Sequence, residues 1–384
     1  MEFDFGPDAL EYKGEARALL DEELTAERLA EVHRTGTFHS WDFHRALAHR
    51  GWLAPGWPVE YGGRGLDPLA VVAFAEELND AGAPMIGVGT TMMIAGVIRE
   101  LGTEQQKSEI LPKALGGELL IVLGFTEPEC GSDLAAASTK AIRDGDQWII
   151  NGQKMFTTNA HIADYVFLLA RTDPEAPKHK GLTTFLVPLH QDGVTIQPVM
   201  TMGGERTNVT FYDDARVDDA WRIGAVNGGW DTMGVALTLE RTHAVGGEHR
   251  RLVAAAERWA AKAMGANGRP LIEDESVGAR LARAATEARV TRLLGLRSVA
   301  LYARGGMPGV EGSMAKLFGS ESLVRMADDL AMLTPDGLRT DDVGHDGEPE
   351  RAVRHAQAKT IYGGTSEVQR SIIAQRGLGL PRGA

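Results

Sequence analysis

The chain has 384 residues, of which 43% are hydrophobic and 24% charged, and a formal net charge of −13. This length predicts two or three packed structural units. The negative charge excludes the basic stripe that a nucleic-acid surface requires, and it disfavours contact with anionic membranes. The single cysteine, Cys130, excludes an intramolecular disulfide and a cysteine-rich metal site, so we predict no metal centre.

The N-terminus and the hydropathy pattern predict where the protein resides. Residues 1–30 are acidic and lack a basic start followed by an apolar core, so no signal or transit peptide is expected. No apolar run approaches the roughly 20 residues needed to cross a bilayer. We therefore expect a cytoplasmic protein with no membrane-spanning segment.

Residues 8–118 have a helical pattern. Apolar residues recur at spacings of three and four in Leu69–Leu78 and in Thr90–Leu101, which predicts two amphipathic helices. The segment Ala54–Gly65 is rich in glycine and proline and predicts an irregular connector.

Near residue 120 the pattern changes to short strands. The dipeptides Asp144-Gly145 and Asn151-Gly152 are both strong hairpin signals. Further strands are expected at Tyr165–Ala170, Thr183–Pro188, Val194–Pro198 and Val209–Tyr212. Strands this short and closely spaced, without helices between them, predict a small antiparallel β unit.

From Gly229 onward the pattern is helical again. Long helices are expected at residues 230–264, 275–304, 313–333 and 350–376, and their short connections predict an antiparallel four-helix bundle. No G-x-G-x-x-G sequence follows a strand and no P-loop is present, so a nucleotide cofactor would need another kind of site.

Three separated motifs combine residues that suit a cofactor site: Gly124–Asp133 (GFTEPECGSD), Lys154–Thr158 (KMFTT) and Ile361–Gln369 (IYGGTSEVQ). The first is a turn whose backbone amides and hydroxyls can donate to a ring edge or a phosphate. The second offers an aromatic face beside two hydroxyls. The third places two glycines just before a helix start, where anions bind.

In this order the motifs resemble the acyl-CoA dehydrogenase family over essentially the whole chain. The resemblance implies a mainly α fold with a central β-barrel. It divides the chain into an N-terminal helical domain (1–118), a middle β-barrel domain (119–225) and a C-terminal four-helix bundle (226–384). It also implies FAD as cofactor and an α,β-dehydrogenation of an acyl-CoA thioester, in which flavin N5 accepts the β-hydride.

The resemblance also assigns roles to individual residues. The residues expected to contact FAD are Phe125, Thr126, Ser132, Phe156, Thr157, Thr158, Gly364, Thr365, Ser366 and Glu367. Ser132 would also approach the CoA arm, and Arg241, Tyr362 and Gly363 would contribute to substrate binding. The backbone N–H at Gly363 would donate to the thioester carbonyl, as in an oxyanion hole.

The catalytic base of many family members is the glutamate of a Tyr-Glu-Gly-Thr sequence, and here Gly363 occupies that place. In isovaleryl-type members the base lies on the first bundle helix before an arginine, which implies Glu240, followed by Arg241. Met233 and Leu237 share a helical face with Glu240, and desolvation on such an apolar stripe would raise the pKa of a carboxylate toward neutral pH. The alternative is a structural ion pair between Glu240 and Arg241, although adjacent helical residues point about 100° apart.

The partner contacts of the family are only partly matched. Met264 and Glu275 stand where members carry an arginine and a glutamine that reach the FAD pyrophosphate of a neighbouring subunit. This departure resembles heteromeric steroid-side-chain dehydrogenases, so a homo- or hetero-oligomer, dimer or tetramer, is expected. The resemblance further implies an electron-transfer flavoprotein as electron acceptor. Two alternatives stay open: oxidation of a carrier-protein-bound acyl group in secondary metabolism, and a partner subunit that completes another chain's site.

Overall fold

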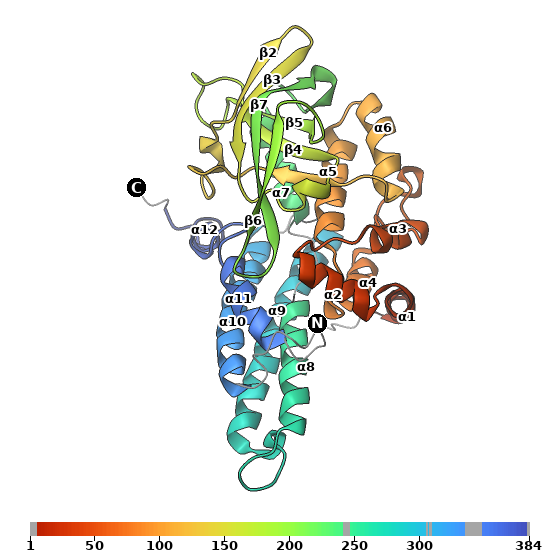
Figure 1. The fold of residues 1–384 in the computed structure, drawn as a ribbon, viewed down its shortest axis with the longest axis vertical. Helices are drawn as coiled ribbons and strands as arrows, with labels where there is room; N and C mark the ends of the chain where they lie inside the picture. Colours follow the sequence, from red (N-terminus) through yellow and green to blue (C-terminus); the bar gives the residue numbers. More distant parts are fainter. Residues whose placement is uncertain (1–5, 241–245, 305, 307–308, 335–347, 382–384) are drawn as a thin grey trace.

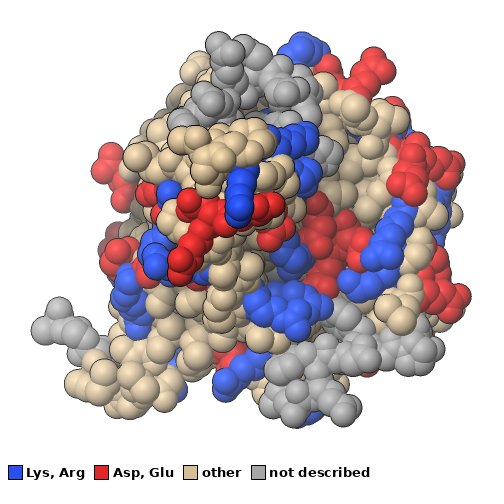
Figure 2. All heavy atoms as spheres, turned by 90° about the horizontal axis from the view of Figure 1, so that it is seen from below, with Lys and Arg blue, Asp and Glu red and all other residues tan. Residues whose placement is uncertain are grey.

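The protein is represented by a computed structural model that describes residues 6–240, 246–304, 306, 309–334 and 348–381. Figure 1 shows a β-sheet at one end, long helices at the other and the N-terminal helices along one side. Within the described ranges, no helix combines the length and the apolar character needed to cross a membrane. On the face seen in Figure 2, acidic and basic side chains are interspersed, so this face carries a field of mixed sign.

Six helices precede the sheet: α1 (Gly6–Glu23), α2 (Ala26–Thr35), α3 (Trp41–His49), α4 (Pro68–Asp80), α5 (Ile86–Leu101) and α6 (Glu104–Leu115). The helices predicted at 69–78 and 90–101 are confirmed as α4 and α5. Local chemistry explains two of the starts. Asp67 caps α4, which has proline at its first position, and Thr103 and Gln106 form a capping box on α6.

Polar contacts fix these helices against the rest of the molecule. The Thr91 hydroxyl on α5 accepts a hydrogen bond of 2.9 Å from the backbone N–H of Ile121. The Gln106 side chain on α6 donates to the carbonyls of Ala220 and Arg222, at 2.6 and 2.9 Å. The N-terminal helices therefore buttress the sheet on one side, as Figure 1 shows.

The middle of the chain forms eight strands: β1 (Ile121–Gly124), β2 (Lys140–Asp144), β3 (Gln147–Lys154), β4 (Tyr165–Arg171), β5 (Leu182–Pro188), β6 (Val194–Met200), β7 (Arg206–Asp218) and β8 (Arg222–Ile223). Their order is β6-β7-β3-β2-β4-β5-β8, with β1 beside β4. The pairs β1–β4 and β2–β4 are parallel and the others antiparallel. The sheet is thus mixed, not purely antiparallel as predicted.

The expected closed β-barrel is corrected to an open, curled sheet. Strands β2 and β4 share only the pair Lys140–Arg171, so the sheet divides there into two wings. Apolar side chains of both wings pack on one another, and the rings of Trp148 on β3 and Phe185 on β5 lie 5.3 Å apart. Side-chain packing therefore fills the interior, and no strand pairing in the described residues joins β6 to β8.

The two predicted hairpins have different outcomes. Asp144 pairs with Gln147 around a turn in which Gly145 has a φ of 63°, which confirms the first hairpin. The second prediction is wrong, because Asn151-Gly152 lies inside β3 as a β-bulge opposite β7. A β-carbon on Gly152 would lie 2.8 Å from Cα of Thr139, so glycine there permits a close backbone approach.

The C-terminal part contains α7 (Gly229–Glu240), α8 (Gly247–Lys262), α9 (Glu275–Ala303), α10 (Val310–Leu333), α11 (Glu348–Lys359) and α12 (Ser366–Ile372). The helices predicted over 230–264 and 350–376 are each divided in two. Gly246, with a φ of 95°, precedes α8, and Gly363 and Gly364 have φ of 64° and 86° between α11 and α12. Left-handed backbone cannot continue a right-handed helix.

Helices α8, α9, α10 and α11 pack around one apolar core, which is the predicted four-helix arrangement. Leu252 and Ala256 on α8, Leu281 on α9 and Leu323 and Leu330 on α10 are almost fully buried within it. Helix α7 does not belong to this core. It packs against α5 and β5, and Figure 1 shows it at the junction between sheet and bundle.

A buried histidine pair near α3 predicts acid sensitivity. His39 and His44 are 6% and 0% exposed, their rings lie 5.2 Å apart, and within the described residues none of their ring nitrogens has a hydrogen-bond partner. Burial lowers the pKa of His39 to about 3 and that of His44 to about 4. Both pKa values lie below that of an unfolded histidine, so the unfolded chain takes up these protons first as pH falls.

We therefore expect the free energy of unfolding to be unaffected by this pair above about pH 6.5 and to fall at lower pH, by about 2 kcal/mol per histidine at pH 5. Melting temperatures at pH 7 and 5 measure this loss. His44→Phe removes one buried titrating ring and should reduce the drop. His49→Phe, at an exposed position of the same helix, is the matched control. An equal drop in both variants would contradict the assignment.

Candidate active site

A buried ion pair brings the first two motifs together. Lys154 ends β3, and its ammonium lies 2.7 Å from Oε1 of Glu127 in the turn after β1. It also donates to the carbonyl of Phe125 at 3.1 Å, and the backbone N–H of Met155 donates to the carbonyl of Thr126 at 2.8 Å. The turn after β1 and the end of β3, nearly thirty residues apart in sequence, are therefore held together rigidly. We call this joined element the rim.

The carboxylate of Glu127 is the centre of this rim. Besides Lys154, it accepts hydrogen bonds from the backbone and hydroxyl of Ser138, both at 2.7 Å, and from the backbone N–H of Thr139 at 2.9 Å. Burial alone would raise its pKa, but the charge and hydrogen bond of Lys154 and the bonds from Ser138 lower the pKa of Glu127 to about 2. Glu127 is therefore ionised at neutral pH.

The second motif presents an aromatic ring to the exterior. Phe156 is 57% exposed and has a φ of 58°, a conformation that costs free energy in a non-glycine residue. Thr157 points inward, is fully buried and shares a hydrogen bond of 3.3 Å with Thr210 on β7. Thr158 is half-buried beside Thr207. Of the three predicted contacts here, Phe156 and Thr158 are accessible as side chains, whereas the side chain of Thr157 faces the interior.

In the first motif the predicted residues differ in exposure. Phe125 is half-buried and packs edge-on against Phe167 in the core, with ring centroids 5.9 Å apart. Thr126 is half-buried and Ser132 is exposed. Cys130 is a free, buried thiol, so it has no partner for a disulfide.

The third motif forms the turn between α11 and α12. Thr365 caps α12 by accepting from the backbone N–H of Val368 at 3.2 Å. Lys316 on α10 donates to the carbonyl of Gly364 at 2.6 Å, and the Gln369 side chain donates to the carbonyl of Gly363 at 3.0 Å. Lys316 was not among the predicted residues, because its contact with Gly364 joins segments 48 residues apart in the sequence.

Gly363 has a backbone conformation that favours glycine. Its φ of 64° is one that residues with a β-carbon rarely adopt, at a cost of about 1–2 kcal/mol. A glutamate at this position would be strained in the observed turn. The backbone conformation at position 363 therefore suits the glycine found there better than a glutamate.

The third motif meets the sheet through the turn between β6 and β7. The backbone of that turn accepts a hydrogen bond of 2.9 Å from Arg354 on α11 at Met202, and Glu205 lies 2.7 Å from His355. Strand β7 continues from this turn to the hydroxyls beside Thr158. Strand β7 therefore connects the hydroxyls beside Thr158 with α11, the helix that leads into the third motif.

The predicted base lies at the end of α7. Helix α7 ends at Glu240, whose side chain lies outside the described part of the structure, as does the whole of Arg241. The preceding turn is anchored, since Met233 is buried and Leu239 packs on α5, where a β-carbon on Gly96 would lie 2.9 Å from it. An apolar interface between α5 and α7 therefore holds the end of the helix at which position 240 lies.

The exposed groups of the three motifs fit a flavin dinucleotide. The Phe156 ring is 57% exposed and offers an aromatic face. The hydroxyl of Ser366, a predicted cofactor contact, is buried and has no hydrogen-bond partner in the described residues. An orphaned buried hydroxyl costs free energy unless a ligand supplies its partner.

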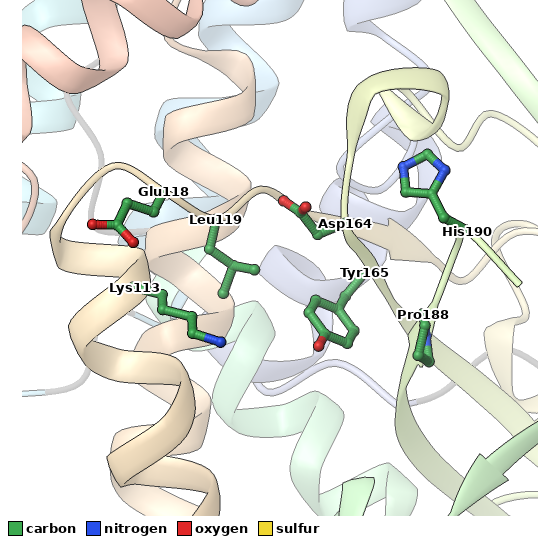
Figure 3. A pocket seen from close by; sticks show the side chains of 7 residues that line it. All are labelled: Lys113, Glu118, Leu119, Asp164, Tyr165, Pro188 and His190. Atoms are coloured by element: carbon green, nitrogen blue, oxygen red, sulfur yellow. The ribbon is translucent and has the colours of Figure 1, made fainter.

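A separate pocket of about 400 Å³ lies between the end of α6 and the edge of the sheet (Figure 3). It is lined by Lys113, Glu118, Leu119, Asp164, Tyr165, Pro188 and His190. None of the predicted site residues lies in it. We therefore place the candidate site at the three motifs.

Comparison with known proteins decides the family. Three family models match in sequence: the acyl-CoA dehydrogenase N-terminal domain over residues 7–118, the middle domain over 122–214 and the C-terminal domain over 227–378. The chain belongs to the acyl-CoA dehydrogenase family. This family consists of oxidoreductases that act on CH–CH bonds. In the described residues of this member, no group of three or more side chains is suited to bind a metal ion.

Similar proteins cover the whole chain. Acyl-CoA dehydrogenase FadE26 of Mycobacterium tuberculosis is 36% identical over 100% of this chain and 99% of its own length. Among solved structures, the Tcur3481-Tcur3483 steroid ACAD is 31% identical, with a TM-score of 0.91 and full coverage of both chains. The ChsE4-ChsE5 complex from Mycobacterium tuberculosis is 33% identical, also with a TM-score of 0.91 and full coverage of both chains.

Proposed function

We propose that this chain catalyses the FAD-dependent α,β-dehydrogenation of an acyl-CoA thioester, with Glu240 as base. The observation that carries the proposal is the rim formed by the first two motifs. Its buried ion pair between Lys154 and Glu127 rigidly presents the exposed Phe156 ring and the half-buried Thr158 hydroxyl. Family membership supplies the reaction type.

Each accessible motif residue has a task in this proposal. Phe156 and Thr158 would bind the flavin ring, with Phe125, Thr126 and Thr157 shaping the rim beneath it. Ser132 would contact both the cofactor and the CoA arm. On the other side, the residues that would hold the dinucleotide are Gly364, Thr365, Ser366 and Glu367.

The chain's own residues would handle the proton and the carbonyl. Glu240 would remove the α-proton, with Arg241 beside it at the substrate. The backbone N–H of Gly363 would donate to the thioester oxygen and so stabilise the charge that develops there. When bound, FAD supplies the acceptor for the β-hydride, and we propose an electron-transfer flavoprotein as the subsequent electron acceptor. In this scheme the units 119–225 and 226–384 contribute the site residues, and the unit 1–118 supports α7 through α5.

We further propose a bulky acyl group as substrate. Gly363 places no side chain beside the thioester position, which leaves room next to the α-carbon. One similar solved protein supports this choice, because it is described as a steroid ACAD.

Anaerobic reduction of bound flavin tests the proposal. Purified protein is expected to be yellow and to lose its visible absorbance when mixed with a branched or steroid-derived acyl-CoA. Straight-chain acyl-CoA and acyl-carrier protein should react more slowly. Flavin that stays oxidised with every acyl-CoA but bleaches with the acyl-carrier protein would indicate that the substrate is a carrier-bound acyl group. No bleaching with any thioester would contradict the function.

The degraded partner contacts favour a second candidate, a subunit of a heteromeric dehydrogenase. Met264 is 61% exposed and Glu275 is exposed at the start of α9, so neither offers a cation to a neighbour's pyrophosphate. In this case the chain expressed alone would be colourless, and co-expression with a second family member would restore flavin. Stoichiometric FAD in the chain expressed alone would exclude this candidate.

A further inference from the structure

Asn208 on β7 binds the backbone of the second motif from the interior of the sheet. Its backbone carbonyl accepts a hydrogen bond of 2.9 Å from the N–H of Thr157, and its side-chain amide donates to the carbonyl of Thr157 at 3.0 Å. Both residues are fully buried. The peptide groups on either side of Thr157 are therefore fixed, and these groups set the directions of Phe156 and Thr158.

The partners of the Asn208 side chain determine how its amide is oriented. Nε of Arg206 lies 3.2 Å from Oδ1 of Asn208, and Nδ2 of Asn208 lies 3.3 Å from Nδ1 of His161. A guanidinium can only donate and a carbonyl can only accept, so the amide oxygen faces Arg206 and the amide nitrogen faces Thr157. The second N–H of the amide is therefore the one that meets His161, and Nδ1 of that ring must accept it.

These contacts also fix the tautomer of His161, which lies in the short helix η3 (Ala160–Ile162) directly after the second motif. Because Nδ1 accepts, the neutral ring carries its proton on Nε2, which lies 3.1 Å from the hydroxyl of Thr37. Burial and the charge of Arg206 lower the pKa of His161 to about 4, so the ring is neutral at pH 7. Thr37 follows α2 in the N-terminal helical unit. Hydrogen bonds therefore connect that unit with the backbone of the second motif.

The second motif needs such support because its backbone is strained. Phe156 has a φ of 58°, and the N–H of Thr158 donates to the carbonyl of Phe156 at 2.9 Å, which closes a tight turn. A strained conformation persists only where the surrounding structure holds it. Asn208 is fully buried, so it can affect a ligand only through the backbone that it binds.

We propose that Asn208 is a positioning residue of the cofactor site. It holds the turn at residues 156–158 in the conformation that presents the aromatic ring and the hydroxyl to the flavin, and it is itself held by His161 and Thr37. This inference rests on the proposed function. It gives the N-terminal unit a part in cofactor binding, although none of the three motifs lies in that unit.

Two substitutions of His161 test this inference. His161→Leu leaves an amide N–H of Asn208 and the hydroxyl of Thr37 without their partner, and it should raise Kd for FAD about tenfold. His161→Gln offers both an acceptor and a donor, so it should recover most of the affinity. Thr37→Val removes only the outermost hydroxyl and should have a smaller effect. His190→Leu, at an exposed position of the same sheet unit, is the matched control. FAD fluorescence released on dilution of the holoprotein measures Kd.

NMR of isotope-labelled histidine provides a readout that does not depend on FAD. The signal of His161, identified by its loss in His161→Gln, should show the proton on Nε2 at pH 7. Asn208→Asp replaces the donating N–H by an accepting oxygen, so it should move the proton to Nδ1 or add a second proton to the ring. A wild-type ring with its proton on Nδ1, or a His161 signal unchanged in Asn208→Asp, would overturn the inferred network. If Asn208→Asp does not fold, the wild-type tautomer decides.

The two readouts separate this inference from the proposed function. Wild type that binds no FAD, alone or co-expressed with a second family member, would contradict the proposed function and leave the NMR result intact. Wild type that binds FAD, with His161→Leu equally tight, would overturn the positioning role. Equal loss of affinity in His161→Leu and His161→Gln would also overturn it, because the hydrogen bonds would then not be the cause.

Discussion

Replacement of Glu240 by glutamine is expected to lower turnover about 10²–10⁴-fold while FAD remains bound. Glutamine keeps the volume of the side chain but cannot accept a proton at neutral pH. The loss should appear in the rate of anaerobic flavin reduction by a saturating acyl-CoA. Absorbance of the oxidised protein should match wild type, because α7 is anchored by its buried face and not by position 240.

Two comparisons make the Glu240 result specific. Glu257→Gln changes an exposed carboxylate on α8 and should leave turnover unchanged. The rate of flavin reduction with Glu240→Gln should also stay low across the pH range. If Glu240 had only a structural role, the substitution would lower the free energy of unfolding instead. Wild-type turnover in Glu240→Gln would show that another group is the base.

The second large effect is expected from Lys154→Met, which should lower the free energy of unfolding by about 3–5 kcal/mol at pH 7. The substitution leaves the Glu127 carboxylate buried without its cation, although Ser138 and Thr139 still donate to it. Denaturant unfolding measures the loss. We also expect weaker FAD retention, because the rim that presents Phe156 is no longer fixed.

The same region provides a control for the buried pair. Lys178 and Asp133 form an ion pair of 2.6 Å in which both side chains are more than half exposed. Lys178→Met should therefore cost no more than about 1 kcal/mol. Adding Glu127→Gln to Lys154→Met removes the stranded charge and should recover part of the stability. Similar losses from Lys154→Met and Lys178→Met would show that burial of the pair contributes nothing.

The pair also has a defined pH dependence. The pKa of Glu127 in the folded protein is lowered to about 2, below that of an unfolded glutamate near 4.3. Its contribution to stability is therefore fully present above about pH 4.3 and is lost as pH falls toward 2. His39 and His44 near α3 lose their contribution at higher pH than Glu127, so the two effects should be separable in an acid titration of stability.

The sequence predicted those elements whose signals are local. Helices α4 and α5 follow from the periodicity of their apolar residues, and the turn at Gly145 follows from an Asp-Gly pair. The three motifs identified the family, and the glycine at 363 led to the proposal that Glu240 is the base. These features depend on neighbouring residues, so a single sequence records them.

Other features depended on contacts between distant segments. Asn151-Gly152 has the same turn signal as Asp144-Gly145, but pairing of β3 with β7 on one side and approach of Thr139 on the other make it a bulge. The sheet stays open because apolar packing between its wings, not strand closure, fills the interior. Glycines that look tolerable within a helical pattern divide two predicted helices, because Gly246, Gly363 and Gly364 have positive φ values.

The sequence by itself thus determined the family and the succession of helices, strands and helices along the chain, and it proposed the residues of the candidate site. Only the tertiary structure decided that Lys154 pairs with Glu127, that Thr157 faces inward and that Lys359 pairs with Glu248. The physical reason is that a charged side chain selects its partner by proximity and burial. Both depend on how segments that are distant in the sequence come together in the fold.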